Sequence, residues 1–162
     1  MQTWKSRPIE VAHLLNPAFC ALVLRQAVKG FSDEISAGMP YPLAFLVLPI
    51  VLHRSTREAL PRSIATKMHP WLETNQQVRV GFATRCANVV DHTREGLLYA
   101  SALGLIAFSG DAVIQILSGR LMRPWPAEAE SAVCLKSALF VGRWLARAGD
   151  AVTVYAMWGV RP

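Results

Sequence analysis

Proline and glycine interrupt the hydrophobic pattern of this chain often enough to predict short helices rather than long continuous ones. The first clear start signal is Asn16 followed by Pro17, because an asparagine side chain caps a helix and proline suits its first turn. The apolar positions that follow predict a helix over residues 17–29. Gly30 stands where a helix commonly ends in a left-handed residue, so we expect the helix to end there.

Residues 31–40 are expected to form a loop, and residues 41–52 are apolar on every side. Periodicity alone leaves a buried helix and a buried strand open for 41–52. Pro49 disfavours a central strand because it has no N–H to donate to a neighbouring strand. We therefore expect a buried helix that breaks near Pro49.

Two shorter elements follow. Ser55 and Glu58 have the spacing of a capping box, which predicts a short helix stopped by Pro61. A further short helical turn is expected from His69 to Asn75.

The middle of the chain has the element order of a winged helix. Residues 78–90 and 92–103 are predicted as two helices joined near Asp91, and the β-prone runs around residues 109–111 predict a hairpin. Helix, turn, helix and hairpin in this order indicate a winged-helix-like core over residues 78–120. The expected fold is one mainly α domain (α+β) that spans residues 1–162.

A long helix is predicted over residues 127–148. At about 100° per residue, Lys136, Arg143 and Arg147 fall on one narrow stripe, and the remaining faces are apolar. A helix that is apolar nearly all round is typically buried. The stripe is either a solvated seam or a contact with an anionic partner, because the stems of Lys and Arg also pack well along apolar surface.

Residues 151–158 form the last predicted element. Their β-branched residues leave a strand open, but Asp150 as N-cap and Gly159 as terminator favour a short helix. Tyr155, Met157 and Trp158 in this segment are candidate contacts for a protein partner, since aromatic and Met side chains are favoured at interface cores. The alternative is that these side chains cover the core of the domain itself.

The composition is apolar for a soluble chain, with 52% hydrophobic and 17% charged residues. A membrane-spanning helix needs about 20 consecutive apolar residues, and the best run, 43–52, is shorter and interrupted by Pro49. The first ten residues also lack the apolar region of a secretory signal. We therefore expect a cytoplasmic protein, not a membrane protein, whose excess apolar surface meets protein partners.

No pattern of reactive residues indicates catalysis or a cofactor. The three cysteines are widely separated, and none of the four histidines has a metal-ligand spacing. Nucleophile-elbow, phosphate-loop and dinucleotide-binding motifs are absent. We expect no enzyme activity, no catalytic residue, no metal and no cofactor, and the free cysteines agree with a reducing cytosol.

Arginine dominates the positive charge of the chain, which has a net charge of +6. The most basic stretch, residues 53–69, carries Arg54, Arg57 and Arg62. It is either a solvated surface or a contact with phosphate or an acidic subunit, because the planar guanidinium binds both kinds of anion.

DNA binding has limited support in the sequence. The predicted recognition helix 92–103 offers Arg94 and then mostly apolar residues, whereas base readout needs several polar side chains. Arg120 and Arg123 after the hairpin are candidate contacts to a phosphate backbone or another anionic partner. A protein-binding use of this apolar face agrees better with its residues.

Several segments together resemble a known family: EVAHLLNPAFCALVLRQAVKGF, MPYPLAFLVLPIVLHRSTREALP, HPWLETN, VRVGFATR, GRWLARAG and TVYAMWGVRP. Over residues 7–162 the chain resembles the middle component of three-component ABC systems. The resemblance implies a bacterial antiviral or anti-plasmid defence complex that pairs an SMC-like ABC ATPase with an effector, often a nuclease. It also implies a winged-helix-like subunit that bridges the two in a hetero-oligomer.

The leading expectation is therefore a non-catalytic adaptor subunit, and contact with DNA through the complex stays open. The alternative is a DNA-binding regulator of winged-helix type, whose affinity for DNA would fall as salt concentration rises.

Overall fold

Two helices, α2 (Pro17–Glu34) and α7 (Glu130–Ala146), lie side by side at the centre of the computed structural model, which describes residues 15–117 and 129–161. They run in the same direction, because Glu34 at the end of α2 meets Arg143 near the end of α7. The start of α2 is as predicted: the Asn16 side chain accepts a hydrogen bond from the Ala18 backbone N–H at 2.9 Å. Of the predicted range 127–148, residues 127 and 128 lie outside the described residues.

The predicted end of the first helix at Gly30 is wrong, because α2 continues to Glu34. Gly30 is buried within the helix, where an added Cβ atom would overlap the carbonyl group of Leu139 in α7. In the same way, a Cβ atom at Gly142 would overlap the carbonyl group of Ala27. These glycines therefore allow two backbones to approach closely, which is a use of glycine that differs from ending a helix.

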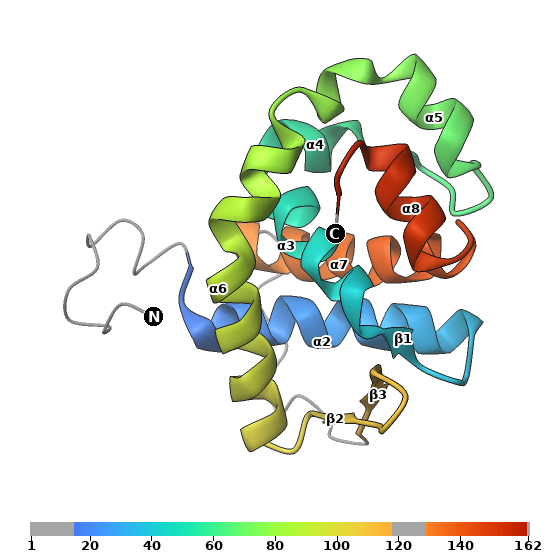
Figure 1. The fold of residues 1–162 in the computed structure, drawn as a ribbon. Coiled ribbons are helices and arrows are strands. Elements are labelled where there is room, and N and C mark those ends of the chain that lie inside the picture. The colour runs from blue at the N-terminus through green and yellow to red at the C-terminus, as the bar shows by residue number, and fades with distance from the viewer. Residues whose placement is uncertain (1–14, 118–128, 162) are drawn as a thin grey trace.

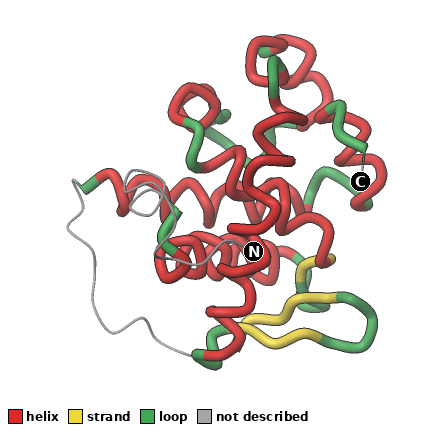
Figure 2. The backbone as a smooth tube through the Cα atoms, turned by 60° about the vertical axis from the view of Figure 1, so that its left-hand side comes forward, coloured by secondary structure: helices red, strands yellow, loops and turns green. Residues whose placement is uncertain are grey.

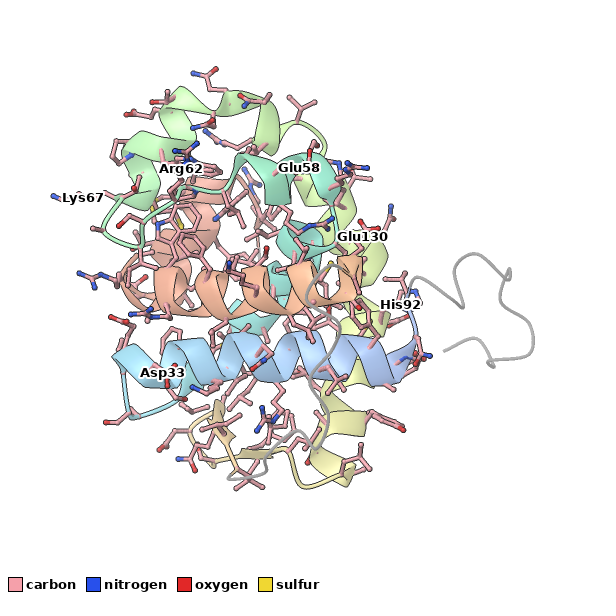
Figure 3. The ribbon with its side chains drawn as sticks, turned by 180° about the vertical axis from the view of Figure 1, so that it is seen from behind. Asp33, Glu58, Arg62, Lys67, His92 and Glu130 are labelled. Carbon is pink, nitrogen blue, oxygen red and sulfur yellow. The ribbon has the colours of Figure 1, made fainter. Side chains whose placement is uncertain are left out.

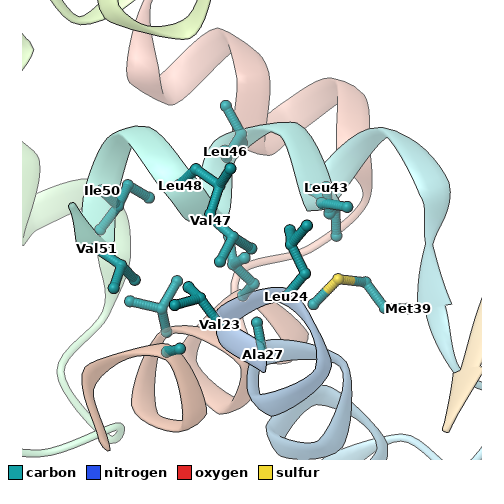
Figure 4. Packing of buried hydrophobic residues seen from close by; sticks show 14 of the residues in the cluster. Val23, Leu24, Ala27, Met39, Leu43, Leu46, Val47, Leu48, Ile50 and Val51 are labelled. Atoms are coloured by element: carbon teal, nitrogen blue, oxygen red, sulfur yellow. The ribbon is translucent and has the colours of Figure 1, made fainter. Parts of the chain in front are cut away.

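The apolar run after the loop forms a buried helix, as predicted. A 3-10 turn (Tyr41–Leu43) leads into α3 (Ala44–Val51), and Pro49 lies inside this helix two residues before its end. Figure 4 shows side chains of α3 packed onto Val23, Leu24 and Ala27 of α2. Nearly every residue of α3 is buried, which agrees with a helix that is apolar on all faces.

The predicted break at Asp91 is wrong. Residues 82–102 form one helix, α6 (Phe82–Ala102), preceded by a 3-10 turn (Gln76–Arg79). No proline or glycine stands at the expected break. The Thr93 hydroxyl donates a hydrogen bond within the helix to the Val89 carbonyl oxygen at 2.9 Å. The helix-turn-helix pair expected for a winged helix is therefore replaced in this segment by a single helix.

The predicted hairpin is present. Strands β2 (Ile106–Phe108) and β3 (Val113–Ile116) pair antiparallel, with Ile106 opposite Ile116 and Phe108 opposite Ile114. A third strand, β1 (Met39–Pro40), pairs with β3 and gives the order β1-β3-β2, although residues 31–40 were expected to be a loop. Figure 2 shows this small sheet at one end of the molecule, beside the end of α6.

Short helices cover the opposite end of the molecule (Figure 1). The capping-box prediction is wrong, because Ser55 lies inside α4 (Arg54–Ala59) and His53 occupies the N-cap position. The Glu58 carboxylate instead accepts a hydrogen bond from Arg54 at 2.7 Å. The next short helix, α5 (Met68–Thr74), covers the predicted turn at 69–75.

The last helix, α8 (Ala151–Trp158), has the predicted caps: the Asp150 side chain accepts from the Thr153 backbone N–H at 2.7 Å, and Gly159 is left-handed with φ 68°. The helix is therefore confirmed over the strand alternative. Taken together, the described residues form a mainly α structure with one small antiparallel sheet, which confirms the predicted fold class.

Candidate partner-binding surfaces

Exposed apolar side chains concentrate at one end of the molecule. Of the nine large apolar residues that are exposed in the described ranges, five lie between residues 98 and 117. We call them the apolar end: Leu98, Tyr99, Leu103, Phe108 and Leu117. They come from the last turns of α6 and from the hairpin, and Figure 1 shows both at the same end of the molecule.

The packing of α6 explains why this surface faces outward. Gly96 lies against α2, where an added Cβ atom would be 2.9 Å from the Leu24 side chain. Leu97 and Ala100 are buried, whereas Leu98 is 62% exposed. Since successive helical residues turn by about 100°, Leu98 points away from the face that meets α2.

The basic stretch does not form a common patch of unpaired arginines. Arg54 is exposed and pairs with Glu58 at 2.7 Å, and this hydrogen bond lowers the pKa of Glu58. Arg57 is buried, and it donates to the Val51 carbonyl oxygen at 2.7 Å and to the Glu130 carboxylate at 2.9 Å. Arg62 remains exposed, on a loop that Figure 3 shows away from Glu58 and Glu130.

A groove of about 500 Å³ lies beside the ion pair between Arg57 and Glu130. Its apolar lining includes Phe19, Leu52 and Cys134. Burial raises the pKa of the Cys134 thiol, so this cysteine is held as a neutral apolar group.

The two aromatic residues of α8, Tyr155 and Trp158, are buried in the core of the domain. Tyr155 is buried and donates its hydroxyl to the Pro42 carbonyl oxygen at 2.7 Å, and burial raises its pKa to about 12. Trp158 is 1% exposed and stacks on Phe82 with ring centroids 4.3 Å apart. Met157 is partly buried against the same core. These positions agree with the second alternative weighed for this segment, in which the side chains cover the domain core.

The basic stripe of α7 meets an anion within the chain itself. Arg143 lies 2.8 Å and Arg147 3.2 Å from the carboxylate oxygens of Glu34 in α2. Lys136 is exposed. The anionic group that two of the three stripe residues contact is therefore an intramolecular carboxylate. Arg120 and Arg123 lie outside the described residues, so a contact through them stays a prediction.

The described residues hold no cluster of three or more His, Cys, Asp or Glu side chains suited to a metal ion. Burial raises the pKa of both Cys20 and Cys86 to about 12. Both thiols are therefore protonated at neutral pH, and a protonated thiol is a weak nucleophile. In the part of the chain that the structure describes, no helix has the length and apolar character needed to cross a membrane.

Sequence reasoning recognised the apolar character of residues 92–103 but named none of the residues of the apolar end as a site. A signal was present, because Leu97, Leu98 and Tyr99 are consecutive and a helix cannot bury three consecutive side chains on one face. The contribution of Phe108 and Leu117 depends on where the hairpin packs, which is a tertiary property.

A model of one protein family matches almost the whole chain. The family is described as ABC-three component (ABC-3C) system Middle Component 3, and the match covers residues 4–162. No curated protein and no solved structure matches the chain.

Proposed function

Because the chain belongs to the Middle Component 3 family of ABC three-component systems, we propose that it is a non-catalytic adaptor subunit. In this proposal it bridges an SMC-like ABC ATPase and an effector, such as a nuclease, in a cytoplasmic complex for bacterial defence against viruses and plasmids. The family description itself supports the coarser statement that the chain is the middle component of a multi-component system.

The observation that carries the adaptor role is the apolar end. Leu98 is 62% exposed and Leu103 is 58% exposed, and Phe108 on the adjacent hairpin is 43% exposed. Several large apolar side chains exposed at one end of a molecule are typical of a site of protein–protein contact. Aromatic and large aliphatic side chains are also the groups that contribute most when they are buried at an interface.

The alternative role as a DNA-binding regulator has less support. The single helix α6 takes the place of the expected helix-turn-helix, and its last turns present Leu98 and Tyr99 outward. Direct readout of bases needs hydrogen-bonding side chains at such positions. Glu34 also partly neutralises Arg143 and Arg147, which otherwise would be available to phosphate.

The experiment compares partner recovery by two tagged forms of the protein in a host that carries the complete system. We expect the natural chain to recover a large ABC ATPase in a fixed ratio. The double variant Leu98→Gln with Leu103→Gln should recover at least about tenfold less, because each leucine buried at an interface contributes about 1.5–3 kcal/mol. Both leucines are exposed, so the fold of the isolated variant should remain stable.

Val152→Gln provides the matched control, since Val152 is 73% exposed on α8 and lies outside the apolar end. It should recover the ATPase as well as the natural chain does. Recovery of DNA without any protein partner by the natural chain would overturn the adaptor proposal in favour of the regulator. Equal recovery by the double variant would place the partner contact elsewhere on the chain.

A further inference from the structure

We draw no further inference here: the strongest candidate, the apolar groove of about 500 Å³ that Phe19, Leu52 and Cys134 line beside the start of α7, carries nothing, because nothing in the described part of the structure shows what covers it.

Discussion

Gly142 of α7 lies against the backbone of Ala27 in α2, so closely that a Cβ atom at Gly142 would overlap the Ala27 carbonyl group. Gly142→Ala should therefore force the two helices apart and lower the free energy of unfolding by at least about 2 kcal/mol. Urea denaturation followed by circular dichroism measures this change. Gly110→Ala is the control, because a Cβ atom at Gly110 meets open space, and its effect should stay within about 0.5 kcal/mol. Equal effects of the two substitutions would show that the helices are not in close contact.

The carboxylate of Glu34 joins α2 to α7 through two arginines. Glu34→Gln removes the charge that Arg143 and Arg147 share, and we expect a loss of about 1 kcal/mol, since all three side chains are partly exposed. The loss should shrink in about 1 M salt, which screens such pairs. Asp33→Asn is the matched control, because among the described residues Asp33 pairs with Lys29 on its own helix and with no residue of α7. A cost for Glu34→Gln no larger than that of Asp33→Asn would contradict the bridging role.

Acid should weaken the start of α8. The hydrogen bond from the Thr153 backbone N–H lowers the pKa of Asp150 in the folded protein. Because this pKa is lower in the folded than in the unfolded state, the cap stabilises the fold fully above the unfolded-state pKa of about 4. The stabilisation is lost as pH falls through the folded-state pKa.

Thermal unfolding from about pH 7 down to about pH 3 tests this expectation. The melting temperature of Asp150→Asn should lie below that of the natural chain at neutral pH and approach it in acid. Asp111→Asn is the control, because the Asp111 side chain forms no hydrogen bond or ion pair to other described residues. If the difference in melting temperature between Asp150→Asn and the natural chain stayed constant with pH, the charge of the Asp150 cap would not be its cause.

A substitution at Tyr155 tests whether the C-terminal segment stabilises the domain core or contacts a protein partner. Tyr155→Phe removes the hydrogen bond to the Pro42 carbonyl oxygen and should lower the free energy of unfolding by about 1–2 kcal/mol. Tyr99→Phe changes an exposed tyrosine of the apolar end and should stay within about 0.5 kcal/mol. Chemical denaturation of the isolated variants gives both values. Unchanged stability of Tyr155→Phe together with reduced partner recovery would assign this tyrosine to an interface.

Local signals in the sequence predicted the ends of several helices correctly. Asn16 and Asp150 cap their helices through side-chain oxygens, and Gly159 ends the last helix in a left-handed conformation. These contacts join residues within a few positions of one another, so the local sequence contains the information that specifies them. The same holds for the hairpin around residues 109–111.

The errors arose where a distant part of the chain decides the outcome. Gly30 has the position of a helix terminator, but its lack of a side chain serves the approach of Leu139 from α7. The stripe of Arg143 and Arg147 left a solvated seam and an anionic partner open, and the sequence could not show that Glu34, more than a hundred residues away, supplies a carboxylate to it. A sequence pattern gives the chemical type of a contact but not the identity of its partner.

The candidate surfaces likewise depend on which parts of the chain pack together. The sequence indicated apolar excess and arginine richness, yet it could not separate the exposed Leu98 from the buried Trp158. It also gave no sign that Phe82 stacks on Trp158, because this contact joins two helices that are far apart in the sequence.

The pairing of α2 with α7 has a consequence for how the protein is made. Ala27 and Gly142 are 115 positions apart in the chain, so α2 leaves the ribosome long before the helix that covers it. At about 5–20 residues per second, the interval lasts roughly ten seconds. During this time Val23 and Leu24 lack part of the core that later buries them. The nascent chain therefore exposes this apolar surface throughout that interval, and its folding is completed only after α7 has emerged.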